Sequence, residues 1–113
     1  MNIPNAERAI VEPSKVRDYL LSPTHAVGRF KAAFFGRLGY AQDNWRELQR
    51  DLALIAQRDT AVPGQFSRFG AKYEVSAILR GPSGRSAAVV TVWMLRTGET
   101  TPRFVTAYPG ELV

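Results

Sequence analysis

The stretch from Lys72 to Tyr108, KYEVSAILRGPSGRSAAVVTVWMLRTGETTPRFVTAY, decides the fold. Its first part, residues 72–79, alternates apolar and polar residues, which is typical of a strand with one buried face. Residues 87–95 are apolar on both faces and rich in β-branched residues, as expected of a central strand covered on each side. Residues 103–108 form a third strand that stops at Pro109, because proline cannot donate to a ladder. The short turns between these strands predict an antiparallel meander.

The part of the chain before the sheet predicts three helices. The first spans about residues 13–21, because a proline opens it and Ser22-Pro23 ends it. The second runs from Thr24, an N-cap residue, to about Leu38. Its expected apolar face consists of Val27, Phe30, Phe34 and Leu38.

The third helix has the clearest pattern. Asn44 and Glu47 are spaced as a capping box at its start, and the helix ends near Gln57. One apolar stripe runs along it, formed by Trp45, Leu48, Leu52 and Ile55. Residues 59–70 then change to Pro, Gly, Ser and Thr with two Phe, which predicts a long loop before the sheet.

Length and composition agree with one folded domain. The chain has 113 residues, of which 45% are hydrophobic and 22% charged, as in ordinary globular proteins. A chain of this size can bury about two-thirds of its unfolded surface in a single core. We therefore expect one domain, residues 1–113, of the α+β class, in which about three N-terminal helices pack on one face of a C-terminal antiparallel sheet of three to four strands.

The absence of some residue types excludes several kinds of chemistry. The chain has no cysteine, which rules out disulfides, thiolate metal sites and a cysteine nucleophile. Its single histidine, His25, has no second histidine with which to form a zinc centre, so we expect no metal. Phosphate-loop and dinucleotide-binding motifs are also absent from the sequence, so we expect no cofactor. The N-terminus lacks the features of a signal peptide, and the longest apolar runs are too short for a membrane span. These features predict a cytoplasmic protein without a membrane partner.

The charge is positive and unevenly distributed. Fifteen Lys and Arg against ten Asp and Glu give a net charge of +5, which favours polyanionic partners such as nucleic acid. No acidic residue occurs between Asp18 and Asp43, where Arg29, Lys31 and Arg37 lie. A second basic stretch holds only Glu74 against Arg68, Lys72, Arg80, Arg85 and Arg96.

His25 stands at the start of the basic second helix. An i, i+4 step places it on one helical face with Arg29. An imidazole is the natural general acid or base near neutral pH, and neighbouring cations can bind a phosphate and stabilise charge in a transition state. The alternative is that His25 is an ordinary exposed or capping residue.

The last strand, RFVTAYP over residues 103–109, places Phe104, Thr106 and Tyr108 on one face by its period of two. Thr106 and Tyr108 can hydrogen-bond a phosphate or a 2′-hydroxyl, and the aromatic rings can stack on a base. The alternative is that the aromatic residues pack under the helices.

This strand resembles the final strand of bacterial RNase toxins of the barnase, EndoU, colicin and RelE-like superfamily, whose order of elements is similar. A second resemblance covers nearly the whole chain. It is to an uncharacterised bacterial family that occurs as small stand-alone proteins and as C-terminal modules of polymorphic toxins. The stretches that carry it are Asn5-Ala6-Glu7, Tyr19 to His25, Gly28 to Ala32, Phe35 and Leu38-Gly39-Tyr40.

The resemblance implies a metal-independent endoribonuclease toxin, in which the 2′-hydroxyl attacks the adjacent phosphorus and a cyclic phosphate forms. The partners it implies are RNA and a cognate antitoxin or immunity protein. Matched to this sequence, it implies His25 as base or acid, Arg29 and Lys31 as phosphate clamps, and Thr106 with Tyr108 as positioning groups. Further substrate-binding residues would be Arg103, Phe104 and Arg96.

Two alternatives remain open from the sequence. The chain can be a non-catalytic module that binds nucleic acid or an acidic protein through the same basic face, in which case its binding depends strongly on salt. It can also be an accessory domain encoded beside a toxin, in which case its charge serves only solubility.

Overall fold

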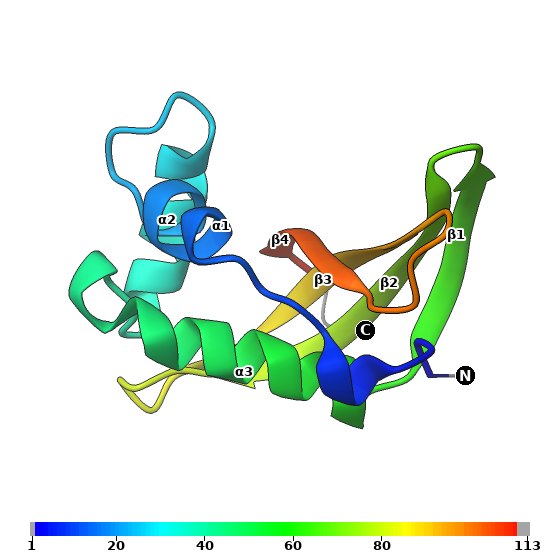
Figure 1. Ribbon diagram of the computed structural model, residues 1–113. Coiled ribbons are helices and arrows are strands. Elements are labelled where there is room, and N and C mark those ends of the chain that lie inside the picture. Colours follow the sequence, from blue (N-terminus) through cyan, green and yellow to red (C-terminus); the bar gives the residue numbers. More distant parts are fainter. Residues whose placement is uncertain (1, 111–113) are drawn as a thin grey trace.

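The C-terminal half of the chain forms an antiparallel sheet of four strands in the order β1-β2-β3-β4. The computed structural model describes residues 2–110 (Figure 1). The strands are β1 (Ala61–Ser67), β2 (Gly70–Arg80), β3 (Ser86–Arg96) and β4 (Arg103–Pro109). The predicted meander and the central place of residues 87–95 are confirmed, and so is the α+β class.

Strand β1 corrects the prediction of a long loop over residues 59–70. It pairs antiparallel with β2, with Ala61 opposite Val75, and its register shifts between Pro63 and Phe66. Proline, glycine and the irregularity remove the alternation by which a strand is recognised in sequence. An edge strand tolerates them because only one of its sides needs hydrogen bonds.

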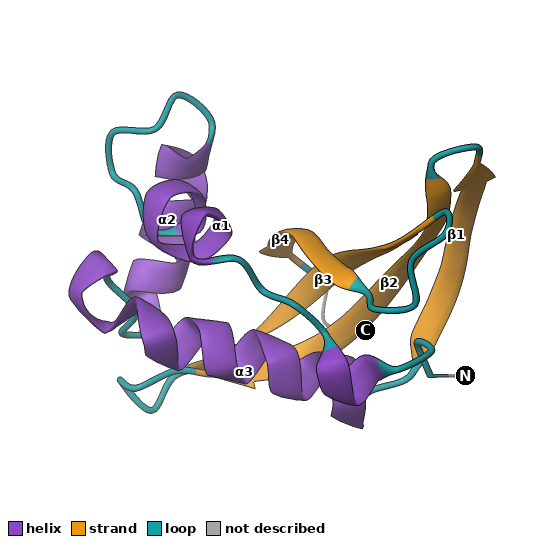
Figure 2. Cartoon of the chain, viewed as in Figure 1, coloured by secondary structure: helices purple, strands orange, loops and turns teal. Residues whose placement is uncertain are grey.

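The helices form the N-terminal half and are drawn in purple in Figure 2. Helix α1 (Pro13–Lys15) continues into the π-helical turn η2 (Val16–Leu20), so the predicted helix over 13–21 is confirmed. Helix α3 (Trp45–Arg58) agrees with the third prediction and buries its stripe, with Leu48 and Leu52 fully enclosed. The short 3-10 turns are η1 (Ala6–Arg8) and η3 (Gln42–Asn44).

The predicted capping box at the start of α3 is wrong. The Asn44 side chain turns back toward the preceding turn, where its Oδ1 accepts from the Ala41 N–H at 2.7 Å and its amide donates to the Gly39 carbonyl at 3.0 Å. The 3-10 turn η3 leads directly into α3, so Asn44 closes that turn instead of capping the helix.

Helix α2 (Gly28–Arg37) begins three residues later than predicted, and only part of its predicted apolar face is buried. Val27 and Phe30, expected in the core, are 58% and 69% exposed. Leu38 of the predicted face is buried, and the packed side reaches it through Gly28, Lys31 and Phe35. A glycine and a lysine in this stripe hide it from a search for apolar periodicity.

The core lies between the sheet and the helices. Trp93 is fully buried on β3, and its indole N–H donates to Thr91 Oγ1 at 2.8 Å, while the Thr91 hydroxyl donates to the Val75 carbonyl at 2.9 Å. Helix α3 packs on this face. The expectation that residues 87–95 are covered on each side is only partly met, because Val90 and Met94, on the other face, are half-buried.

We call that other side the open face of the sheet. It is the face opposite α3, and it carries Lys72, Glu74, Ser76, Val90, Met94, Arg96, Thr106 and Tyr108. The N-terminal segment borders it, because Ile10 forms a parallel bridge with Arg103 and so covers the start of the edge strand β4. In the described residues, no helix is long and apolar enough to cross a membrane.

Candidate active site

Tyr19 occupies the centre of the candidate site and comes from the π-helical turn η2. Val16 and Leu20 in this turn are fully buried and anchor it in the core. The Leu21 N–H donates to the Val16 carbonyl at 2.9 Å, five residues back, which is the hydrogen bond that defines a π turn. Such single π turns are frequent at functional sites. Here the anchored turn leaves the half-buried ring of Tyr19 at the border of the open face.

Gly28 brings α2 against this turn. A Cβ atom at this position would lie 1.9 Å from the Tyr19 carbonyl oxygen, so only glycine allows the two segments to come this close. Lys31 follows three residues later, and residues at this spacing lie on the same side of a helix. The close approach therefore directs the Lys31 side chain toward Tyr19.

Three side chains from distant parts of the chain meet here. The Lys31 ammonium donates to Tyr19 Oη and to Thr106 Oγ1, each at 2.7 Å. The two hydroxyl oxygens are 3.2 Å apart. We call Tyr19, Lys31 and Thr106 the Tyr-Lys-Thr cluster. It joins η2, α2 and β4 beside the open face and contains two of the residues predicted from the sequence.

The cluster changes the acidity of Tyr19. Burial by itself would raise the pKa of this phenol, but the hydrogen bonds from Lys31 and Thr106, with the positive charges of Lys31 and Lys15, outweigh it and hold the pKa below its usual value. A phenol with a lowered pKa next to an ammonium is suited to proton transfer. Tyr19 was not among the residues predicted for the site, because an aromatic residue in a predicted helix is expected to pack in the core. The signal that was available is its hydroxyl, which needs a partner when the ring packs.

We expect Tyr19 to ionise at lower pH than an unperturbed tyrosine. A lowered pKa in the folded state means that folding stabilises the phenolate, so this stabilisation is present above the unfolded value of about 10 and is lost as pH falls through the folded pKa. Titration of phenolate absorbance should show an early component in the wild type that Tyr19→Phe removes. Lys31→Met should move it to higher pH.

The two other tyrosines with a shifted pKa ionise at higher pH than an unperturbed tyrosine, so they do not overlap with the early component. Burial and the carboxylate of Asp51 raise the pKa of Tyr40, and burial and the charge of Glu74 raise the pKa of Tyr108. An early component that persists in Tyr19→Phe would contradict the assignment.

His25 lies beside the cluster and caps α2. Its ring meets the Tyr19 ring edge-on, with the centroids 5.2 Å apart. Nδ1 accepts from the N–H groups of Val27 and Gly28, each at 3.0 Å. An Nδ1 that accepts these bonds carries no proton, so in the neutral ring the proton sits on Nε2. This contact agrees with the alternative that His25 is a capping residue. The geometry also suits Nε2–H as a hydrogen-bond donor better than Nε2 as a base.

Arg29 does not join Lys31. Two residues along a helix turn about 200°, so the two side chains point away from each other. The Arg29 guanidinium donates to the Ala26 carbonyl and lies 4.4 Å from the centroid of the Phe30 ring. The prediction that His25 and Arg29 share a helical face is wrong, because α2 starts only at Gly28 and His25 precedes it. The roles of Arg29 and Lys31 as phosphate clamps stay predictions.

Strand β4 divides its predicted residues between two faces. The β3–β4 register pairs Val92 with Thr106 and Trp93 with Phe104, so Val105 is an extra residue, a β-bulge. The bulge reverses the alternation. Phe104 is 3% exposed and packs edge-on against Trp93, with the ring centroids 5.3 Å apart. The prediction that it shares a face with Thr106 and Tyr108, free to stack on a base, is therefore wrong.

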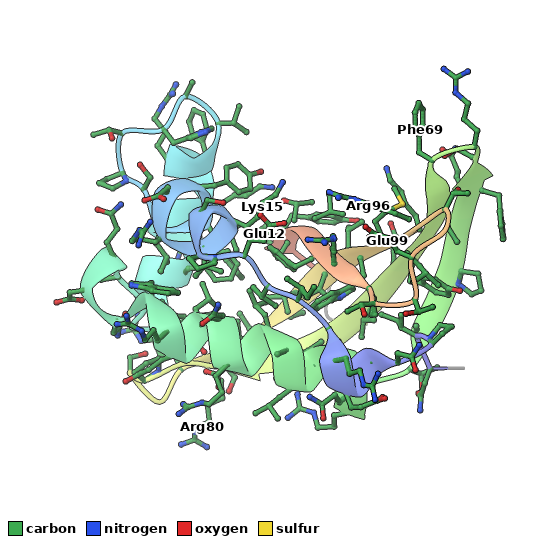
Figure 3. The ribbon with its side chains drawn as sticks, in the orientation of Figure 1. Glu12, Lys15, Phe69, Arg80, Arg96 and Glu99 are labelled. Carbon is green, nitrogen blue, oxygen red and sulfur yellow. The ribbon has the colours of Figure 1, made fainter. Side chains whose placement is uncertain are left out.

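The remaining predicted residues border the open face. The Tyr108 hydroxyl donates to Glu74 at 3.4 Å. Arg103 is held between two carboxylates, at 3.3 Å from Glu12 and 3.2 Å from Glu99, so its charge is already balanced. Arg96 is exposed near the end of β3, on the open face, and Figure 3 shows it and Lys15 above β4 in that view.

Metal chemistry finds no support in residues 2–110, where no three His, Asp or Glu side chains come together as ligands. The chemistry on offer is that of a phenol, an ammonium and a hydroxyl in contact, with an imidazole at the edge. These groups can take up and release protons and can stabilise an anion.

Comparisons with known proteins give one family and one shared fold. Among solved structures, a chain of the "Contact-dependent growth inhibition toxin - immunity protein complex from Klebsiella pneumoniae 342" is similar, with a TM-score of 0.71, 17% identity, and coverage of 95% of this chain and 97% of that chain. At this identity the likeness shows the fold alone. None of the curated proteins matches the sequence. The family model for "Domain of unknown function (DUF6883)" matches residues 2–111, and this protein therefore belongs to that family.

Proposed function

We propose that this protein is a toxin module that cleaves RNA without a metal ion, through attack of the 2′-hydroxyl on the adjacent phosphorus. The observation that carries the proposal is the Tyr-Lys-Thr cluster beside the open face of a basic domain. The fold shared with a chain of a toxin–immunity complex supports the toxin assignment.

In the proposed reaction, the Tyr19 phenolate takes the proton of the 2′-hydroxyl. The 2′ oxygen forms a bond to phosphorus while the bond from phosphorus to the 5′ oxygen breaks, and the Lys31 ammonium protonates the departing oxygen. The resulting amine of Lys31 then takes the proton from the Tyr19 phenol, which restores both groups. Thr106 positions the ammonium, and the Nε2–H of His25 donates to a phosphate oxygen.

The cationic side chains around the open face would bind the RNA backbone. Lys15 and Arg96 lie above β4 in the view of Figure 3, and Lys72 is exposed on β2. Cations at such positions stabilise the extra negative charge of a phosphorane. The same surface would suit an acidic immunity protein, because complementary potentials speed the encounter of two proteins.

The proposal predicts that purified protein fragments total RNA in the presence of EDTA and leaves ends with a 2′,3′-cyclic phosphate. Gel electrophoresis and end-group analysis check this, with DNA of the same length as a substrate that lacks the attacking hydroxyl. Salt-sensitive binding of RNA without any cleavage would contradict the proposal and support the non-catalytic binding module instead.

A further inference from the structure

A hollow lies on the open face, at the tip of the β1–β2 hairpin. It has a volume of about 240 Å³ and is lined by Gln65, Ser67, Phe69, Lys72 and Met94. We call it the hairpin pocket. Phe69 and Met94 give it an apolar part, and Gln65, Ser67 and Lys72 contribute an amide, a hydroxyl and an ammonium. Such a mixture suits a flat, partly polar ring.

The hairpin pocket and the Tyr-Lys-Thr cluster face the same side of the sheet. In the β-sheet register Lys72 pairs with Met94, and Glu74 pairs with Val92, which in turn pairs with Thr106. Lys72 and Glu74 are two residues apart on β2 and therefore share a face. From ordinary strand spacing and rise, the Cα atoms of Thr106 and Lys72 are about 12 Å apart. One extended strand of nucleic acid can therefore reach both residues.

The backbone of Phe69 is held in place, and its side chain is exposed. Its carbonyl accepts from the Thr97 N–H at 2.9 Å, and its own N–H donates to Ser67 Oγ at 3.1 Å. The Thr97 hydroxyl also binds the Arg68 carbonyl at 2.8 Å. These bonds tie the hairpin tip to the turn that follows β3. The ring is 67% exposed, and the guanidinium of Arg68 lies 5.0 Å from its centroid.

We propose that the hairpin pocket binds a nucleobase of a single-stranded RNA whose scissile phosphate lies at the Tyr-Lys-Thr cluster. The inference rests on the proposed function and adds a subsite to it. Phe69 stacks on the base, Gln65 hydrogen-bonds the base edge, and Lys72 binds the adjoining phosphate. An exposed aromatic ring with cations beside it is the arrangement by which proteins hold single strands.

Binding of a 2′-O-methyl RNA oligonucleotide tests the subsite separately from cleavage, because this probe lacks the attacking hydroxyl. Fluorescence anisotropy with Phe69→Ala should show affinity about tenfold weaker than that of the wild type, from loss of one stacked base. Phe66→Ala is the matched control. Phe66 belongs to the same hairpin and is 85% exposed, but it pairs with Ala71 and so projects from the opposite face. Its replacement should leave the affinity unchanged.

The outcomes separate this inference from the proposed cleavage. If Phe69→Ala binds the probe as tightly as the wild type does, the subsite is overturned, even where RNA is cleaved. If Phe69→Ala alone weakens binding but the wild type leaves RNA intact, the subsite stands and the cleavage proposal fails. An oligonucleotide that lacks bases should bind the wild type and Phe69→Ala equally. Melting curves of both variants should match that of the wild type, because both rings are exposed.

Discussion

Replacement of Lys31 by methionine is expected to lower RNA cleavage by about 100-fold or more, the usual cost of removing a proton-transfer group or a charge that stabilises the transition state. Methionine keeps much of the length of the side chain but removes the ammonium that bonds Tyr19 and Thr106. The two hydroxyls remain 3.2 Å apart and can still bond to each other, so the fold should persist. Initial rates on a defined RNA measure the effect.

Arg37→Met is the matched control, because it removes one positive charge from the same helix at an exposed position outside the cluster. It should cleave RNA nearly as fast as the wild type does. Tyr19→Phe should lose as much activity as Lys31→Met, and the double variant should lose little more, because groups that act as a unit are not additive. Full activity in Lys31→Met would remove the cluster from the mechanism.

Replacement of Gly28 by alanine is expected to destabilise the fold by roughly 1–3 kcal/mol, the range for overpacking a close contact. The added Cβ would stand 1.9 Å from a backbone oxygen of Tyr19, and backbone cannot rotate away as a flexible side chain can. Helix α2 must therefore shift away from η2. Because that shift moves Lys31 from Tyr19, activity should fall further than the loss of folded protein explains. Urea denaturation and cleavage rates at low denaturant measure the two effects.

Gly36→Ala tests whether the effect belongs to the contact or to glycine in a helix. Gly36 lies in the same helix, and a Cβ there would meet no atom within 4 Å. This variant should be more stable than the wild type by about 0.5–1 kcal/mol, because alanine restricts the unfolded chain and favours the helix. Equal destabilisation by both substitutions would show that the approach at Gly28 is not the cause.

The elements with a strong single period could be predicted from the sequence. The stripe of α3 and the alternation of β2 each follow one buried face, and the structure confirms both. The start of α2 could not be predicted from the sequence. It depends on the His25 imidazole accepting two backbone N–H groups, a contact that residue order does not reveal. The β1 strand was missed because pairing with β2, and not its own propensity, holds it.

The candidate site was half predictable for a similar reason. Lys31 and Thr106 are polar residues in prominent places, so charge and strand position point to them. Tyr19 looks like a core residue until its tertiary partners are known. The prediction for Phe104 assumed that side chains alternate between the two faces of a strand, and the extra residue at Val105 reverses this alternation. Local patterns describe single elements, whereas the site depends on contacts between elements.

The order in which the chain is synthesised gives the Tyr-Lys-Thr cluster a further property. Thr106 lies 87 residues after Tyr19, which corresponds to roughly 4–17 s of translation at ordinary rates. For the last 75 of these residues, which follow Lys31, the nascent chain holds the phenol and the ammonium without the strand that brings in Thr106. The ribosome therefore releases the third group of the cluster long after the first two, and a prematurely terminated product lacks it. In the cell that makes the protein, the complete cluster therefore forms only after β4 has been added to the sheet.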